Sequence, residues 1–153
     1  MNYINTNINP ILIDDDFWIY EQNKEYYPFK RKNIGKWMLF YPKNKLNKYW
    51  QQMRHLYNDG KLCGVVSLKC STNKENPRSS DNNYGVIILY CTNSENEDMI
   101  LEIGRNILKY ANYNKYAKYS YIYYKTDAQT LLGTRFNGQK RNYTYKLYAI
   151  NDS

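Results

Sequence analysis

The order of strand-like and helix-like segments constrains the fold of this chain more than any single motif does. Short apolar or alternating runs predict strands, and two longer stretches repeat apolar residues at the spacing of a helix with one buried face. In chain order, strands are predicted at 17–20, 36–41, 62–71, 84–91 and 119–125, with helices at 45–58 and 95–113. This order favours an α+β fold, in which a curved, mostly antiparallel sheet carries both helices on one face. A ferredoxin-like sandwich shares the first six elements and stays open as an alternative.

Local signals set the expected limits of these elements. Gly60 lies where a left-handed residue ends the first helix, and Ser94–Glu97 has the spacing of a capping box before the second. The pair at 137–138, Asn-Gly, predicts a hairpin turn. Residues 1–16 are interpreted as a flexible lead-in and residues 17–150 as one domain, because no repeat or linker interrupts them.

The apolar segments and the cysteines indicate in which cellular compartment the protein is expected. No stretch is long and apolar enough to span a membrane, and the N-terminus lacks the basic and apolar regions of a secretion signal. The cysteines, Cys63, Cys70 and Cys91, are odd in number and lack C-x-x-C spacing, so neither a disulfide framework nor a zinc site is expected. We therefore expect a cytoplasmic protein that holds no metal ion or cofactor and does not associate with a membrane.

The net charge of +8 is unevenly distributed along the chain. Residues 1–104 carry thirteen Lys or Arg against twelve Asp or Glu, whereas residues 105–153 carry nine against two. Such asymmetry predicts a polyanionic partner, either a nucleic acid or a phosphorylated ligand. The alternative interpretation is a solvated surface whose charge only keeps the protein soluble.

The motifs of several enzyme classes are absent from the sequence. It contains no P-loop, no dinucleotide-binding glycine pattern and no nucleophile elbow. The single histidine, His55, falls in the first predicted helix, and only Asp127 and Asp152 supply carboxylates in residues 105–153. An enzyme on a phosphorylated substrate would use His55 or Lys125 with Asp127, and paired-carboxylate catalysis would need Asp127 with an acid from the N-terminal half. We therefore expect a protein without catalytic residues.

Aromatic and basic side chains supply what a nucleotide site needs, since an aromatic face holds a base by stacking and cations hold phosphates. The candidate cations are Lys69, Lys74, Lys125, Arg135, Lys140 and Arg141. Trp18, Tyr26 and Tyr27 lie outside the periodic core pattern, where a stacking role competes with plain packing. Trp37 is predicted to be a core residue. Trp50 is predicted to lie in the core or, alternatively, to be exposed for a partner.

Five segments in the same order resemble the translation initiation factor 4E superfamily, the mRNA cap binders. They are IGKWMLFY, NKYWQQMRHL, CGVVSLKCS, YGVIILYCTNSENEDMILEIGRNIL and YYKTDAQT, and the resemblance covers about residues 34–148. Within the superfamily, WIY, GKW and YYKTDAQTLLG are most similar to the Bles (basophilic leukaemia expressed protein) family. The resemblance implies a 4E-like fold.

The resemblance also implies a phosphate site. Lys69 matches a cation on the strand that contacts the cap phosphates, and a further family cation falls near Lys74. In cap binders, a loop that matches residues 133–142 closes over the phosphate chain. In this chain that loop contributes Arg135, Lys140 and Arg141.

The implied base site differs from that of true cap binders, which stack the methylated base between two tryptophans and pair its edge with the glutamate of a Pro-x-Trp-Glu motif. That motif is missing here. The matching stretch supplies Glu25 as the acceptor and Tyr26 or Tyr27 as the stacking ring, with Trp18 as the only tryptophan before it. Tyr90 replaces a family tryptophan beside the base.

The leading hypothesis is a non-enzymatic protein that binds a nucleotide or a capped RNA 5′ end, for which the resemblance implies a role in translation initiation. Trp50 would then face a helical scaffold peptide on the outer helix surface. Three alternatives stay open. The same site could sequester a signalling cyclic nucleotide, as an immune countermeasure of a virus with an AT-rich genome. The protein could be a lyase or phosphodiesterase on a phosphorylated substrate, or an interaction domain with an inert pocket.

Overall fold

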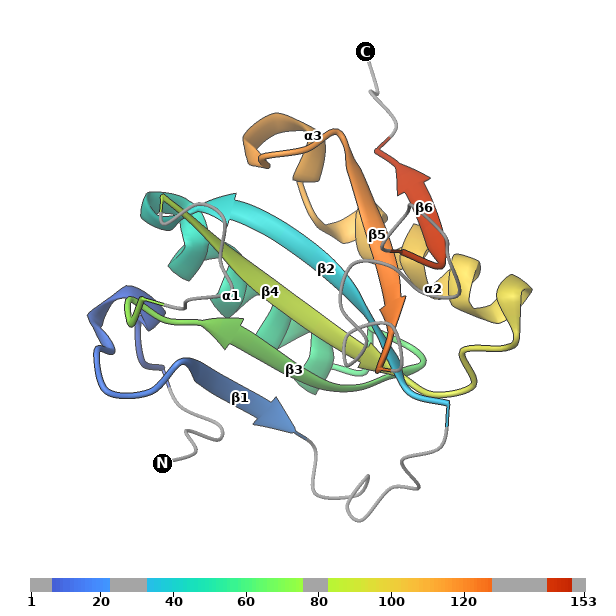
Figure 1. The fold of residues 1–153 in the computed structure, drawn as a ribbon, viewed down its shortest axis with the longest axis horizontal. Helices are drawn as coiled ribbons and strands as arrows, with labels where there is room; N and C mark the ends of the chain where they lie inside the picture. The colour runs from blue at the N-terminus through green and yellow to red at the C-terminus, as the bar shows by residue number, and fades with distance from the viewer. Residues whose placement is uncertain (1–6, 23–32, 76–82, 128–142, 150–153) are drawn as a thin grey trace.

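Six strands and four helical segments make up the described part of the chain, which comprises residues 7–22, 33–75, 83–127 and 143–149 of the computed structural model (Figure 1). The strands are β1 (Trp18–Gln22), β2 (Gly35–Pro42), β3 (Val65–Ser71), β4 (Tyr84–Cys91), β5 (Tyr121–Thr126) and β6 (Tyr145–Tyr148). The helical segments are the 3-10 turn η1 (Pro10–Leu12) and the α-helices α1 (Lys43–Asn58), α2 (Glu97–Tyr110) and α3 (Tyr113–Tyr116).

The strands form one antiparallel sheet in the order β1-β3-β4-β2-β5-β6. In the view of Figure 1, α1 and α2 both lie behind this sheet, which confirms the predicted α+β fold with its helices on one face. β4 lies between β2 and β3, and β2 lies between β4 and β5. The four central strands and two helices therefore form two interlocked split β-α-β units, as in a ferredoxin-like sandwich, and β1 and β6 extend the sheet at its edges.

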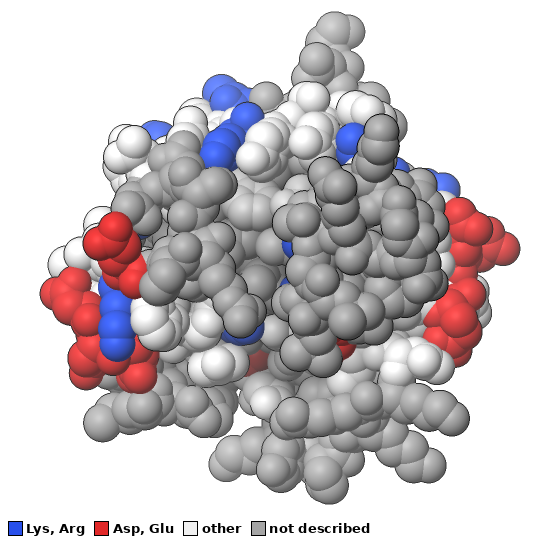
Figure 2. Space-filling model, viewed as in Figure 1, with Lys and Arg blue, Asp and Glu red and all other residues white. Residues whose placement is uncertain are grey.

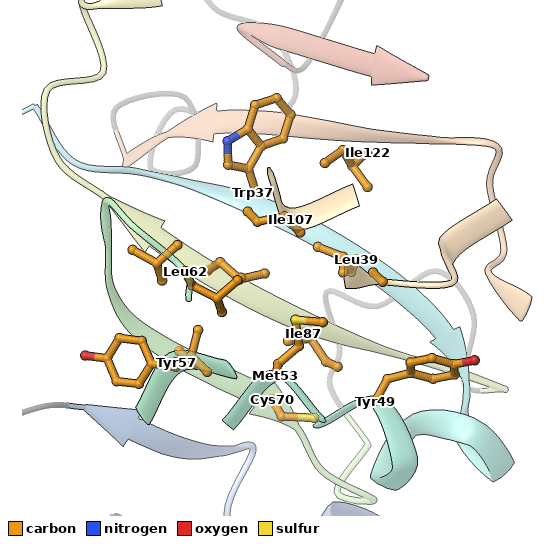
Figure 3. Close-up of a cluster of buried hydrophobic side chains, with 14 of the residues drawn as sticks. Trp37, Leu39, Tyr49, Met53, Tyr57, Leu62, Cys70, Ile87, Ile107 and Ile122 are labelled. Atoms are coloured by element: carbon orange, nitrogen blue, oxygen red, sulfur yellow. The ribbon is translucent and has the colours of Figure 1, made fainter. Parts of the chain in front are cut away.

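The core lies between the sheet and the two long helices, and β2 supplies one of its two buried tryptophans. Alternation along this strand turns Trp37, Leu39 and Tyr41 toward the helices, where all three are fully buried. The indole N–H of Trp37 donates to the carbonyl oxygen of Ile100 in α2 at 3.2 Å, so its polar atom is satisfied. Figure 3 shows Met53 of α1 among the strand side chains of this core. The predicted core position of Trp37 is confirmed.

α1 forms where the spacing predicts a helix, and its apolar face closes the core. Its buried residues are Leu46, Tyr49, Trp50, Met53, Arg54 and Tyr57. Trp50 is only 1% exposed, so the hypothesis that its ring faces a partner on the outer helix surface is wrong. The residue lies on the apolar face of α1, and that face packs into the core. Beyond the helix, Gly60 has a φ of +74°, the predicted left-handed conformation that glycine adopts without steric cost.

α2 is capped by Asn96, not by the predicted capping box that begins at Ser94. The Asn96 side chain accepts a hydrogen bond from the backbone N–H of Met99 at 3.2 Å. The Ser94 hydroxyl donates instead to the carbonyl oxygen of Asn33 at 2.8 Å and lies 2.7 Å from the hydroxyl of Tyr124. The capping-box prediction is therefore wrong, because tertiary contacts engage the serine.

The N-terminal segment packs against α1. Gln51 of α1 donates from Nε2 to the carbonyl oxygen of Ile8 at 3.4 Å, and η1 lies beside the same helix. Glu21 of β1 is fully buried and accepts a hydrogen bond from Nε of Arg54 in α1, the one ion pair formed between described residues. The expected flexible lead-in of residues 1–16 thus contains a packed stretch from residue 7 onward, and its first residues lie outside the described part.

Gly104→Ala in α2 is expected to lower the free energy of unfolding by about 1–2 kcal/mol, the cost of overpacking less the gain in helix propensity. A Cβ at this position would lie 2.5 Å from Cζ2 of Trp37 and 2.6 Å from Cδ1 of Leu147, closer than carbon atoms pack. Urea-induced unfolding followed by circular dichroism measures the change. The matched control is Glu102→Ala, at an exposed position of the same helix. Equal stability of wild type and Gly104→Ala would contradict the close approach of α2 to β2.

Candidate functional site

Lysine and aromatic side chains gather on the sheet face that carries no described helix. Because side chains alternate along a strand, Lys36 of β2, Lys69 of β3 and Lys125 of β5 point away from the helices. The register sets Lys36 beside Tyr90 of β4 on one side and beside Lys125 on the other. Figure 2 looks onto this face, with red acidic side chains at the left and right margins and blue basic side chains along the top.

Two aromatic rings flank the ammonium group of Lys69. Its Nζ lies 4.0 Å from the ring centroid of Trp18 in β1 and 5.5 Å from that of Tyr90. Nζ of Lys36 lies 5.9 Å from the same Tyr90 centroid. Cations within about 6 Å of a ring centroid are attracted to the ring face. Trp18, Lys36, Lys69, Tyr90 and Lys125 together form what we call the open-face site.

Burial disfavours the charged form of all three lysines. It is the main reason why the pKa of Lys69 falls to about 8; the charge of Lys36 lowers it further, and Asp127 partly opposes the shift. Burial also lowers the pKa of Lys36, with Asp127 opposing and Lys125 adding to the effect. Burial alone lowers the pKa of Lys125. The site is a cluster of partly buried like charges, so binding an anion would lower its free energy.

The charge of this cluster is not neutralised by ion pairs with the described carboxylates. The one ion pair among described residues joins Glu21 and Arg54 on the helix side of the sheet. Asp127 follows β5 and acts on Lys36 and Lys69 through its charge. Shifted pKa values in a cluster of like charges are typical of binding and catalytic sites.

Lys69→Met is expected to raise the stability of the ligand-free protein at pH 7. The pKa of Lys69 is about 8 in the folded state and 10.5 ordinarily, so its charge opposes folding below pH 8, and the penalty fades as pH rises from 8 toward 10.5. The gain is on the order of 1 kcal/mol, since a pKa unit corresponds to about 1.4 kcal/mol and solvent screens part of the effect. Thermal unfolding at pH 7 and pH 9 measures it. A gain of equal size at both pH values would assign the effect to packing and not to charge.

The structure brings four of the predicted site residues together, namely Trp18, Lys69, Tyr90 and Lys125. The prediction omitted Lys36, which lies at the centre of the cluster. The signal for it was present in the sequence, because the alternation that buries Trp37 turns the preceding residue to the opposite face.

The other predicted residues lie elsewhere. Lys74 is exposed beyond the end of β3, where its Nζ lies 4.4 Å from the ring centroid of Phe17 and 3.4 Å from the carbonyl oxygen of Asp15. Trp50 is in the core. The remaining candidates, Glu25, Tyr26, Tyr27, Arg135, Lys140 and Arg141, lie outside the described residues, as does the predicted turn at 137–138.

The helix side of the sheet brings together no comparable group of predicted site residues among those described. His55 is exposed on α1, so the sheet separates it from Lys125, and the structure does not assemble a catalytic pair of His55 with Asp127. A hollow of about 660 Å³ beside α2 includes Cys63 and Arg105 but none of the predicted site residues. No group of three or more His, Cys, Asp or Glu gathers among the described residues to hold a metal ion. None of the described helices has the length and apolar character needed to cross a bilayer.

Fold and site together define a class of protein, an α+β sheet protein with a basic, aromatic face opposite its helices. The family described as basophilic leukemia-expressed protein Bles03 matches residues 30–133, more than half of the chain. The chain belongs to this family, as its motifs predict. The match includes Lys36, Lys69, Tyr90 and Lys125 and begins after Trp18. Comparison with curated proteins found no match.

Proposed function

We propose that this protein binds a nucleotide or a capped RNA 5′ end without catalysing a reaction on it. The observation that carries the proposal is the position of Lys69, whose ammonium group lies over the rings of Trp18 and Tyr90, with Lys36 and Lys125 nearby on β2 and β5. An aromatic heterocycle that carries phosphates suits this arrangement, because it offers a flat face to the rings and negative charge to the lysines.

The energetics favour a ligand with several phosphates. Stacking on a ring contributes about 1–3 kcal/mol per base. Hydrogen bonds to charged groups contribute about 1.5–3 kcal/mol each. A phosphate beside Lys69 also raises its pKa back toward the ordinary value, since opposite charge favours the protonated form. Binding an anion thus offsets the unfavourable free energy of keeping the partly buried Lys69 charged in the ligand-free site.

The proposal includes a 4E-like fold and a cytoplasmic role in cap recognition during translation initiation. Its support is the order of the elements, together with Lys69 and Tyr90 at the positions of a phosphate-binding cation and a ring beside the base. Tyrosine in place of tryptophan keeps an aromatic face at this position, although with a smaller ring.

Sequestration of a signalling cyclic nucleotide is the second candidate, favoured by the same cluster of lysines and rings. The ligand distinguishes it from cap binding, because a cyclic dinucleotide carries two singly charged phosphodiesters, whereas a cap carries a triphosphate bridge. An enzyme is less favoured, since His55 lies across the sheet from Asp127. Within the open-face site, Lys69 is the residue with a pKa suited to proton transfer.

Titration with 7-methylguanosine triphosphate, GTP, ATP and cyclic dinucleotides at low salt, followed by tryptophan fluorescence, tests the proposal. We expect at least one of them to bind, with an affinity that falls as salt is added and as pH rises above 8, where Lys69 loses its proton. Failure of every phosphate-bearing ligand to bind at low salt would overturn the proposal. Conversion of the bound ligand into a product would show that the protein is an enzyme and not solely a binding protein.

A further inference from the structure

A second aromatic surface adjoins the open-face site along β5 and β6. We call it the tyrosine floor, and its members are Tyr119, Tyr121, Tyr123, Tyr143 and Tyr148. Tyr121 and Tyr123 share the face of Lys125, because the residues between them, Ile122 and Tyr124, are buried toward the helices. β5 therefore connects the tyrosine floor directly to the open-face site.

The rings of the tyrosine floor touch one another across two strands. The ring centroids of Tyr119 and Tyr121 are 5.2 Å apart with an interplanar angle of 22°, and those of Tyr121 and Tyr123 are 6.2 Å apart. The ring centroid of Tyr148 in β6 lies 5.8 Å from that of Tyr121, and the ring centroid of Tyr143 lies 6.2 Å from that of Tyr123. The five rings thus form one continuous patch.

The core does not account for these rings, since it lies on the opposite face of the sheet. The first four members are half-buried, and Tyr148 is 64% exposed. Scattered surface aromatics are ordinary, but a contiguous, partly exposed patch of rings is typical of an interaction surface. Tyrosine suits such a surface, because its hydroxyl contacts water while its ring stays available for stacking.

Cations lie among the rings of the tyrosine floor. Nζ of Lys146 is 4.3 Å from the ring centroid of Tyr121, 4.8 Å from that of Tyr143 and 5.7 Å from that of Tyr148. Nζ of Lys118 is 5.4 Å from that of Tyr119. The described residues 113–127 and 143–149 contain four lysines against a single carboxylate. Rings interleaved with cations match a partner that alternates flat bases with phosphates.

We infer that the tyrosine floor is a stacking surface for a single-stranded nucleic acid whose terminal nucleotide occupies the open-face site. The inference rests on the proposed function and names its ligand as a chain of several nucleotides. From Lys125 to Tyr121 the strand covers about 13 Å at its usual rise per residue. This leaves room for bases beyond the terminal one. A duplex is excluded from this mode of binding, because its bases are stacked inside the helix.

The test compares GTP with 5′-triphosphorylated single-stranded RNAs of three and six nucleotides, with fluorescence anisotropy or calorimetry as the readout. The wild-type protein should bind the six-nucleotide RNA at least tenfold more tightly than GTP, since each further stacked base adds affinity. Tyr121→Ala combined with Lys146→Gln should remove this gain and leave GTP affinity within about twofold. Tyr148→Ala, at the exposed sheet edge, should remove part of the gain without disturbing the fold.

The matched control is Lys109→Gln with Tyr110→Ala on α2, a cation and ring 5.6 Å apart on the helix side. This variant should keep the full gain with RNA length. Equal affinity for GTP and the six-nucleotide RNA would overturn the inference and leave the proposed function standing. Binding of a duplex as tightly as the single strand, or an equal loss in the control, would also overturn it. Failure of GTP and of every RNA to bind would overturn the inference, and the proposed function would fall with it only if 7-methylguanosine triphosphate, ATP and the cyclic dinucleotides also failed to bind.

Discussion

Replacing Lys36 and Lys69 together with glutamate is expected to weaken binding of a nucleoside triphosphate at least 100-fold. Each ammonium group supplies a charge-assisted contact of about 1.5–3 kcal/mol, so losing two costs about 3–6 kcal/mol. About 2.7 kcal/mol already corresponds to 100-fold in the dissociation constant. The repulsion of two carboxylates by the phosphates adds to this loss. Calorimetric titration at constant ionic strength measures the change.

The control for this result is Lys61→Glu with Lys109→Glu, which makes the same change of charge at two exposed positions on the helix side. It should weaken binding only a few-fold, and salt should erase the effect, because exposed charges beyond about 10 Å are screened. Lys36→Gln with Lys69→Gln serves as a second variant that places no carboxylate in the partly buried site. Equal losses in the helix-side control and in either site variant would contradict a localised phosphate site.

Arg54→Met is expected to lower the free energy of unfolding by about 3–5 kcal/mol, the cost of leaving a buried charge without its partner. Glu21 is fully buried, and its second carboxylate oxygen, Oε2, has no hydrogen-bond partner among the described residues. Arg54 also donates to the side-chain oxygens of Asn7 at 3.1 Å and Gln51 at 2.6 Å, so its loss frees the N-terminal segment as well. Urea-induced unfolding measures the change.

The companion variant Glu21→Leu with Arg54→Met should recover most of the lost stability, because a buried ion pair replaced by apolar residues is often close to neutral. β1 carries both Glu21 and Trp18, so Arg54→Met should also weaken ligand binding, and the double variant should restore it. A loss below about 1 kcal/mol in Arg54→Met would contradict the dependence of the buried Glu21 carboxylate on Arg54.

The fold was largely predictable because its elements depend on local patterns. The strand at 84–91 and the helix at 45–58 follow from periodicity, and Gly60 ends α1 for a local steric reason. The end of α2 was not predictable in this way. The prediction extends it to residue 113, whereas the helix ends at Tyr110. Tyr113 instead opens α3, where its ring packs 5.6 Å from that of Tyr41 in the core.

The site was predictable only in part, because it depends on which strands become neighbours. Resemblance to cap binders singled out Lys69 and Tyr90, and alternation could have added Lys36. The approach of Trp18 to Lys69 required the pairing of β1 with β3, where Trp18 lies opposite Ser71. No local pattern specifies that pairing across the intervening chain. At Trp50 the local pattern was the better guide. The resemblance to cap binders placed this residue at a partner contact, but Trp50 belongs to the apolar face of α1 and is buried in the core.

The most direct measurement of the open-face site is a fluorine NMR titration of protein labelled with 5-fluorotryptophan. The three tryptophans report on different places, since Trp18 lies in the site, whereas Trp37 and Trp50 are 0% and 1% exposed in the core. We expect the Trp18 resonance to shift saturably as a nucleoside triphosphate is added, while the two core resonances stay in place. In Lys69→Met, a higher ligand concentration should be needed for the same shift. A Trp18 resonance that stays fixed while the ligand binds would show that the ligand does not occupy the open-face site.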